Sequence, residues 1–284
     1  MSIRVRSTLL TISPLLLTAL GAGCGTSAMS DNGSGGNRTT GAGGATGLGG
    51  LPGAGGGGGS TVVVGGSGCP LFTADDAWNT DITNVPVDDA QTAKINTLVG
   101  TAKIHPDFGP GFGIPFNVVP QSQPPLPITF DGYPDESDPG PYPFPDVSVA
   151  RIEGPDPRTC DGDCHLLTVQ MGTCLLYEGY ACHYTNGWVC SNGAKWDLRK
   201  KSYGQRPDGW TSVDAAGLPI YAGLARYEEV QAGEITHAIR FTLKCTAASE
   251  VPPATHHAVP GGCNPANGPP MGTRVRLADE PVSE

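Results

Sequence analysis

The sequence predicts an all-β domain, a single antiparallel β-sandwich of the jelly-roll type with long loops rich in proline and glycine. A closed β-barrel is the alternative. Three observations lead to this prediction: helical periodicity is weak, apolar runs are short, and 42 glycines and 27 prolines punctuate the 284 residues between those runs. Many short strands separated by turn signals are typical of sandwiches and barrels.

Eight segments are candidate strands because each is a short apolar or alternating run between turn residues. They are 116–120, 127–131, 165–171, 174–182, 187–198, 225–230, 235–244 and 272–278. Two dipeptides predict hairpin turns, Gly172-Thr173 and Asn192-Gly193, and the second is the strongest short hairpin signal. A helix is expected over 87–100, with Asp88 or Asp89 as its cap and its apolar residues facing inward.

The N-terminus predicts export. Arg4 and Arg6 precede an apolar run that is too short to span a bilayer, which indicates a signal peptide over residues 1–23. The small residues before Cys24 resemble the lipobox of bacterial lipoproteins. This resemblance implies a lipid on Cys24 and, because Gly25 follows it, a place in the outer membrane or at the cell surface. A secreted protein without the lipid is the alternative.

The segment behind the signal peptide predicts a tether. Residues 24–68 are rich in glycine, which makes up most of 35–60, and cannot bury a core. As a flexible coil this segment would hold its ends roughly 35 Å apart on average. Residues 69–284 then form one β-rich extracytoplasmic domain, a length that suits a single sandwich.

The charge excludes some partners. The chain has 17 basic and 27 acidic residues, and loss of residues 1–23 removes two arginines and no acid, leaving 15 − 27 = −12. Such a chain is a poor partner for nucleic acid or an anionic membrane surface. We therefore expect membrane contact only through the N-terminal lipid.

The cysteines predict disulfides. Eight cysteines follow Cys24, and an even number in an exported domain indicates pairing. Short spacing favours the pairs 160–164, 182–190 and 245–263, which leaves 69–174 as a long-range closure. The rival interpretation, a zinc–thiolate site, lacks the C-x-x-C spacing.

The loop 133–145 carries the first candidate site residues. Glu136 and Asp138 lie among prolines that stiffen the chain, and carboxylates on a rigid loop can act as acid and base or bind calcium. Tyr133 and Tyr142 could offer their rings to a sugar. The alternative is a solvated acidic loop. Calcium is the one cofactor that this loop suggests, and no other cofactor is expected.

His165 and Glu178 are candidates on neighbouring strands. His165 begins a strand, shares a face with Leu167, and follows Asp161 and Asp163, either of which could orient its ring. Glu178 alternates within an apolar strand, so burial would raise its pKa and suit a general acid. The alternatives are a histidine at a strand edge and a glutamate that pairs with an arginine.

His237 shares a strand face with large apolar residues, and alternation places Glu234 on the other face, so a joint metal site of this pair is not expected. His256 could approach His237 if the chain returns alongside, and the two, with an Asp or Glu, would then make a metal or acid–base site. Otherwise His237 is a core histidine. Trp210, in a glycine–proline loop, and Arg240 are candidate substrate-binding residues.

Seven strings together resemble a family of exported proteins met in actinobacteria and myxobacteria. They are DESDPGPYP, HLLTV, CLLYE, GWTSVDAAGLPI, RYEEV, GEITHAIRFT and PATHHA, and the resemblance covers nearly all of residues 69–278. It implies an extracellular β-rich domain and no particular chemistry.

The leading functional hypothesis is a surface-tethered hydrolase of extracellular polysaccharide. A glycosidase needs two carboxylates about 5–10 Å apart, and Glu136 or Asp138 with Glu178 would supply them, with His165 and His237 in support. Lyase chemistry with a histidine or tyrosine base is a variant. Two alternatives stand beside the enzyme: a non-catalytic carbohydrate- or calcium-binding surface module, and a structural envelope lipoprotein.

Overall fold

The computed structural model describes residues 4–5, 10–12, 67–100, 113–258 and 263–277. The predicted lipid on Cys24 and nearly all of the predicted signal peptide and tether lie outside them. The elements are β1 (Arg4–Val5), β2 (Leu10–Ile12), α1 (Asp89–Val99), β3 (Phe116–Val119), β4 (Ile128–Phe130), β5 (Leu166–Gln170), β6 (Leu175–Tyr180), β7 (His183–Tyr184), β8 (Trp188–Cys190), β9 (Asn192–Asp197), α2 (Tyr227–Ala232), β10 (Glu234–Ile235) and β11 (Ile239–Phe241). Three short 3₁₀ helices join them, η1 (Pro134–Glu136), η2 (Tyr221–Gly223) and η3 (Pro265–Asn267).

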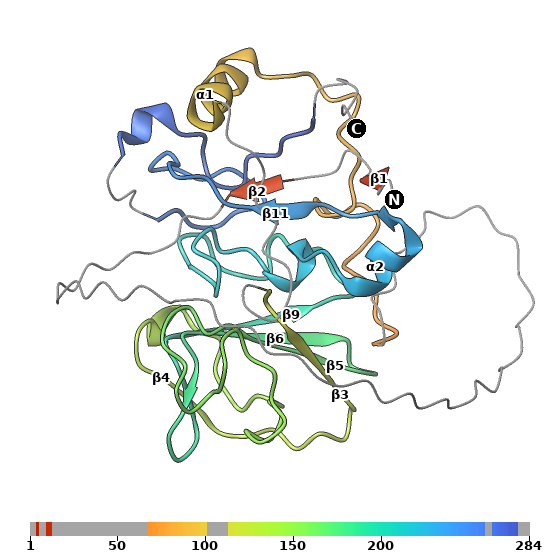
Figure 1. Ribbon diagram of the computed structural model, residues 1–284, viewed down its shortest axis with the longest axis vertical. Helices are drawn as coiled ribbons and strands as arrows, with labels where there is room; N and C mark the ends of the chain where they lie inside the picture. The colour runs from red at the N-terminus through yellow and green to blue at the C-terminus, as the bar shows by residue number, and fades with distance from the viewer. Residues whose placement is uncertain (1–3, 6–9, 13–66, 101–112, 259–262, 278–284) are drawn as a thin grey trace, which may run out of the picture. The chain divides into compact units, whose positions relative to one another are not determined.

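The largest sheet has the strand order β3-β5-β6-β9 (Figure 1). β3 runs parallel to β5, and the β5–β6 and β6–β9 pairs are antiparallel. A second sheet, β4-β8-β7, also contains one parallel pair, and β10 and β11 pair in parallel with β1 and β2. The described residues thus form mostly sheet with few helices. These sheets are mixed rather than purely antiparallel, and none of them closes into a barrel. The jelly-roll sandwich stays a prediction.

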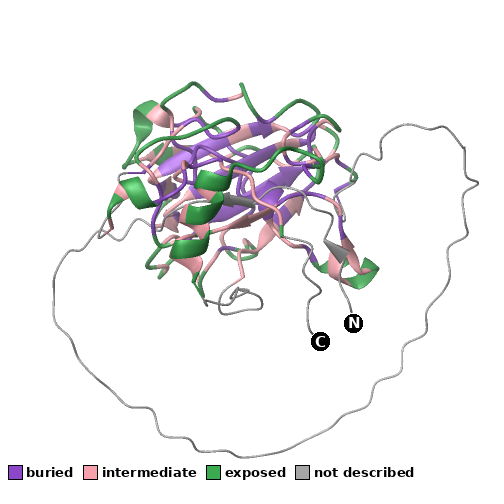
Figure 2. Cartoon of the chain, turned by 90° about the horizontal axis from the view of Figure 1, so that it is seen from above, coloured by how far each residue is buried: buried purple, intermediate pink, exposed green. Residues whose placement is uncertain are grey.

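Both faces of the largest sheet are buried (Figure 2). Leu167, Leu176 and Trp196 pack into one hydrophobic core, whereas Leu166 and Tyr177 pack into the other. Because successive side chains of a strand point to opposite faces, a strand between two cores carries apolar residues at every position. This explains why the sequence pattern of β6 shows two apolar faces.

One predicted hairpin is confirmed and the other is wrong. β5 and β6 form the hairpin that turns at Gly172, whose φ is +78°. Asn192 and Gly193 instead lie inside β9, which pairs with β6, while β8 pairs with β4 and β7. At Gly193 an added Cβ would lie 2.4 Å from the Phe130 ring, so this glycine permits close packing rather than a turn.

The helices differ from expectation in two respects. α1 begins after Asp88, whose carboxylate accepts the Gln91 N–H; Ile95, Leu98 and Val99 of its predicted inward face are half-buried, and no residue of the helix is fully buried. α2 replaces a predicted strand over 225–230. Its first turn is closed by Glu229, which accepts the Arg226 N–H, and it ends at Gly233 with φ +76°.

The predicted strand 235–244 is broken into β10 and β11, with Thr236, His237 and Ala238 between them. Ala238 donates its N–H to the Trp78 carbonyl, a partner outside any strand. Residues 272–277, within the last predicted strand, form none. The strands predicted over 116–120, 127–131, 165–171 and 174–182 are confirmed.

Four disulfides join the cysteines as predicted: Cys69–Cys174, Cys160–Cys164, Cys182–Cys190 and Cys245–Cys263. They indicate an oxidising compartment and hence an exported domain. Within the part of the chain that the structure describes, no helix has the length and apolar character needed to cross a membrane.

Candidate functional site

A group of polar and aromatic side chains lies where β5 begins and β6 ends. It consists of Tyr133, Glu153, Asp163, His165 and Tyr180, and we call it the tyrosine–carboxylate patch. The antiparallel register pairs Leu166 with Gly179, so the residues just outside that pair, His165 and Tyr180, also meet. Their ring centroids are 5.6 Å apart. Sheet pairing thus brings the patch together from segments far apart in sequence.

Glu153 orients His165. The Glu153 carboxylate lies 2.5 Å from His165 Nδ1 and also accepts the backbone N–H of His165, while the Glu153 N–H donates to the His165 carbonyl. The other ring nitrogen, Nε2, lies 3.2 Å from the Val213 carbonyl. Burial by itself would raise the pKa of Glu153, but the hydrogen bond and charge of His165 outweigh it and lower that pKa. Both ring nitrogens of His165 therefore already have protein partners.

Tyr180 lies among the remaining members of the patch. Its hydroxyl donates to Asp163 over 3.4 Å. Ser191 links it to Tyr133, since the Ser191 N–H donates to the Tyr180 carbonyl and the Tyr133 N–H donates to the Ser191 carbonyl. Burial, then the charges of Asp163 and its neighbours, raise the pKa of Tyr180 to about 12. The phenol is therefore a hydrogen-bonding group at neutral pH and a poor base.

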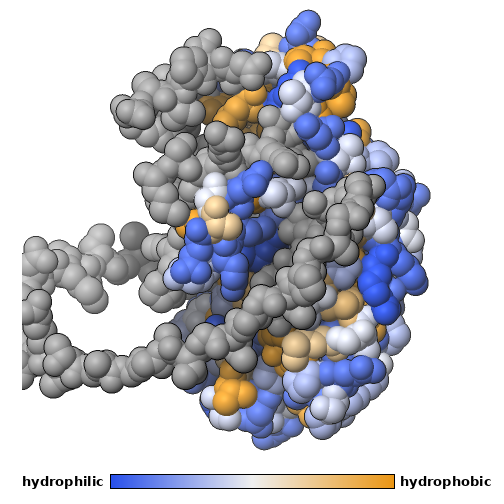
Figure 3. Space-filling view, turned by 90° about the vertical axis from the view of Figure 1, so that its right-hand side faces the viewer, coloured by the Kyte–Doolittle hydropathy of each residue, from blue (hydrophilic) through white to orange (hydrophobic). Residues whose placement is uncertain are grey.

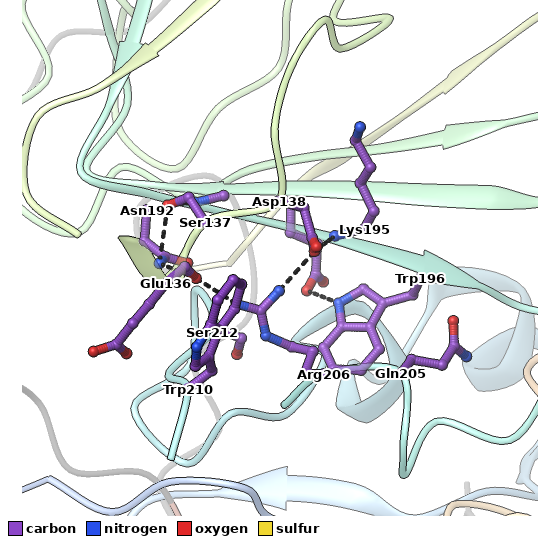
Figure 4. Close-up of polar contacts among 12 residues, drawn as sticks. Glu136, Ser137, Asp138, Asn192, Lys195, Trp196, Gln205, Arg206, Trp210 and Ser212 are labelled. Atoms are coloured by element: carbon purple, nitrogen blue, oxygen red, sulfur yellow. Dashed lines mark hydrogen bonds and ion pairs between the residues drawn. The ribbon is translucent and has the colours of Figure 1, made fainter. Parts of the chain in front are cut away.

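A second group of polar residues surrounds Arg206, and we call it the Arg206 cluster (Figure 4). It consists of Glu136, Asp138, Trp196, Arg206, Trp210 and Thr211. The guanidinium lies 5.9 Å from the Trp196 ring and 5.5 Å from the Trp210 ring. It donates to Asp138 over 2.7 Å and to the carbonyls of Glu136 and Thr211, each over 2.6 Å. Each of its three guanidinium nitrogens therefore donates to a protein group.

The Arg206 cluster fastens the loop that the sequence singled out. Asp138 accepts the Lys195 N–H of β9 as well as Arg206, and the Glu136 carboxylate accepts the Thr211 N–H over 2.7 Å. Both predicted catalytic carboxylates are thus engaged in holding the loop. Tyr133, three residues before Glu136, keeps 39% of its surface exposed. Trp210 is half-buried, with Arg206 beside its ring.

Glu178 lies on β6 and is fully buried where this strand meets η2. Its carboxylate accepts the Trp196 indole N–H over 3.1 Å and the Tyr221 N–H over 2.9 Å. Burial raises its pKa to about 7, although these donors and the charge of His165 oppose the shift. The expected pKa shift is present, but a substrate has no access to a side chain with 0% exposure. The donors to this carboxylate are an indole and backbone amides, not the arginine of the alternative interpretation.

The predicted histidine site does not assemble. His237 has 0% exposure, with Nδ1 2.5 Å from the Ala238 carbonyl and Nε2 2.8 Å from Glu229, although that second contact is poorly aligned for a hydrogen bond. Burial lowers the pKa of His237, and Glu229 opposes the shift. His256 instead contacts the Ala215 carbonyl over 2.7 Å. His237 is therefore a core histidine, as the alternative interpretation had it.

Two of the predicted substrate-binding residues are already engaged by other protein groups. Tyr142 has 0% exposure and donates its hydroxyl to the Asp138 carbonyl over 2.9 Å, so the expectation that its ring stacks on a sugar is wrong. Arg240 forms an ion pair with the buried carboxylate of Asp214. Its charge also helps to lower the pKa of Glu153. Arg240 thus lies near the patch but is already paired.

The described residues contain no group of three or more histidine, cysteine, aspartate or glutamate side chains placed to hold a metal ion. The expectation of calcium on the loop 133–145 therefore has no ligand set among them. A shallow pocket lies beside the Arg206 cluster, lined by Trp196, Ser202, Arg206, Gly217, Leu218, Pro219, Pro253 and Thr255. It has no room for a water molecule, so it cannot hold a substrate.

Two functional features could not be read from the sequence. Glu153, rather than Asp161 or Asp163, orients His165, and the two residues are twelve positions apart with no shared motif. Arg206 contacts Asp138 across 68 positions. The one local signal was the density of aromatic and charged residues near Trp210.

No family model, no curated protein and no solved structure matches this chain. Its function must therefore be argued from its own residues.

Proposed function

We propose that this protein is a cell-surface lipoprotein whose exported domain binds a neutral glycan without cleaving it. The observation that carries the proposal is the tyrosine–carboxylate patch: two tyrosines, Tyr133 exposed and Tyr180 half-buried, lie beside the half-buried carboxylates of Asp163 and Glu153. The lipid on Cys24 and the tether behind it would hold the domain away from the membrane.

The chemistry of the patch suits a sugar. Aromatic rings offer flat apolar faces, and ionised carboxylates accept hydrogen bonds from hydroxyl groups. A chain of net charge −10 repels polyanions, so a neutral glycan fits better than a uronic acid polymer. On the face in Figure 3, the described residues are mainly hydrophilic and the hydrophobic ones form separate small patches.

Binding is favoured over hydrolysis because the proposed catalytic carboxylates have no common access to a substrate. Glu178 is enclosed, and Asp138 is paired with Arg206. One observation favours hydrolysis as the second candidate: the contact between Glu153 and His165 is the arrangement by which a carboxylate orients a general base. His165 would have to break its contact with the Val213 carbonyl before it could reach a substrate.

Titration calorimetry with the purified full-length protein tests the proposal. The ligands are soluble neutral glucans, mannans and xylans, with alginate as the anionic comparison. We expect binding to at least one neutral polymer, and a loss of tenfold or more in affinity for Tyr133→Ala. The matched control is Tyr227→Ala, since Tyr227 is a 70% exposed tyrosine on α2.

Two results would contradict the proposal. If no neutral polymer binds, or if both tyrosine variants bind alike, the patch is not a glycan site. Reducing ends are measured in the same samples. Their release by the parent protein, and its loss in His165→Gln, would favour the hydrolase.

A further inference from the structure

The shortest disulfide ring in the domain adjoins the tyrosine–carboxylate patch. Cys160 and Cys164 are separated by 4 positions, whereas the other three pairs are separated by 8, 18 and 105. The entropy that a cross-link removes from the unfolded chain grows with the length of the loop it closes. This ring therefore contributes the least of the four to global stability, and its role must lie in local geometry.

The ring is docked against the end of β6. The carbonyls of Asp163 and Cys164 accept the N–H groups of Ala181 and Cys182 over 2.7 and 3.1 Å. Cys164 has a φ of +42°, a conformation that side chains other than glycine rarely adopt. The ring holds this backbone in place, and the Asp163 carboxylate thereby faces the Tyr180 hydroxyl.

The opposite side of the ring touches Glu153. Cys160 Sγ lies 3.1 Å from the Glu153 carbonyl oxygen, a packing contact because a disulfide sulfur carries no proton. Gly154 makes room for it, since a Cβ there would lie 2.9 Å from Cys160 Sγ. His165 follows the ring directly in the chain. The five residues of the ring thus include Asp163, contact Glu153 and lead directly into His165. These are three polar members of the patch.

We propose that the Cys160–Cys164 disulfide positions Asp163 for glycan binding and holds His165 against Glu153, so that its oxidation state sets the affinity of the patch. In the oxidised state the ring holds both side chains against Tyr180 and Glu153. A dithiol that attacks the half-buried Cys160 breaks the S–S bond, leaves two protein thiols and is itself oxidised to a disulfide. The freed loop then releases Asp163, and affinity falls. This inference rests on the proposed function.

The test compares two double variants of the full-length protein. Cys160→Ser/Cys164→Ser opens the ring at the patch, and Cys245→Ser/Cys263→Ser opens the larger loop of separation 18 as the matched control. Calorimetry with the neutral glycan that binds the parent protein gives affinity, and thermal melts give stability. We expect the first variant to lose tenfold or more in affinity with the smaller drop in melting temperature. The control should show the reverse.

A second measurement does not depend on the glycan. Burial and then the charge of Asp163 raise the pKa of Tyr180 to about 12, and both depend on the ring being docked, so the absorbance titration of this phenol, assigned with Tyr180→Phe, reports the position of the ring. We expect that pKa to move toward 10 in Cys160→Ser/Cys164→Ser and to stay in the control.

The outcomes separate the two proposals. If the parent protein binds no glycan but the Tyr180 titration moves, the proposed function fails while the positioning role of the ring stands. If the parent binds glycan and the Cys160→Ser/Cys164→Ser variant matches it in affinity and in Tyr180 titration, the further inference is overturned and the proposed function survives.

Discussion

The Arg206 cluster and the tyrosine–carboxylate patch use the same kinds of residue and differ in their access to solvent. The Arg206 side chain is 0% exposed and each of its three guanidinium nitrogens donates to protein, whereas the side chain of Glu153 is 29% exposed and Tyr133 is 39% exposed. A charge enclosed on every side cannot take a ligand and serves the fold. A polar group that is partly exposed to solvent can stabilise the fold and also bind a ligand. The predictions below test this division, from the largest expected effect to the smallest.

The largest effect is expected at Arg206. Arg206→Met keeps most of the side-chain volume but leaves the Asp138 carboxylate and two backbone carbonyls short of a buried donor. We expect the free energy of unfolding to fall by about 3–5 kcal/mol, the usual cost of breaking a buried pair. Urea denaturation monitored by tryptophan fluorescence measures it. Arg199→Met, at a solvent-exposed arginine paired with Asp197, should leave the transition unchanged; equal losses would show that the cluster is not structural.

The second effect is a pH dependence at Glu178. Its folded pKa of about 7 exceeds the ordinary 4.5, so the folded state holds the proton more tightly. The stability that it contributes is complete below pH 4.5 and is lost as the pH rises through 7, by roughly 3 kcal/mol. We expect the melting temperature of the parent protein, relative to Glu178→Gln, to decline from pH 4.5 to 7.5. A constant difference would contradict the shift; Glu228→Gln, on the exposed face of α2, is the control.

A smaller effect is expected at Glu153. Its lowered pKa means that the pair with His165 stabilises the fold above about pH 4.5, and that this stability is lost as the pH falls through the depressed folded value. Because the carboxylate is partly exposed, solvent screens the pair, and Glu153→Gln should cost about 1 kcal/mol at pH 7. Urea midpoints at pH 7 and pH 3 measure it. Glu250→Gln, which removes the more exposed pair with His257, should cost less.

The smallest effect on stability is expected at Tyr133. Tyr133→Phe removes only the hydroxyl of an exposed side chain, so the melting temperature should match that of the parent protein. Glycan affinity should fall less than in Tyr133→Ala, because the stacking face remains. If the melting temperature falls as far as in Arg206→Met, Tyr133 is a structural residue. The distinction between the Arg206 cluster and the tyrosine–carboxylate patch would then not hold.

Local signals in the sequence predicted local structure. Gly172 marked the β5–β6 turn, Asp88 marked the start of α1, and the short cysteine spacings marked their pairs, because each depends on neighbours along the chain. Asn192-Gly193 misled for the same reason: the dipeptide favours a turn, but long-range packing against Phe130 and pairing with β6 place it in a strand.

The candidate site was predicted only in part. His165 and Tyr133 were identified as single residues, yet their partners come from contacts that no periodicity encodes, Glu153 for the one and Ser191 for the other. Glu178 shows a further limit. An acid in an apolar strand predicts a raised pKa equally well in a closed core and in an open cleft, and only the packing of η2 against it decides between them.

The Cys69–Cys174 disulfide has a mechanical consequence. Cys69 stands at the start of the domain, and Cys174 immediately precedes β6 in the largest sheet. In a protein held by its N-terminus, a pulling force enters through Cys69 and passes along a covalent bond to that sheet. The residues that follow Cys69 cannot be peeled away first. A pull on the proposed N-terminal anchor would therefore reach β6 directly, and residues 70–173 inside the disulfide loop would not be extended while the bond is intact.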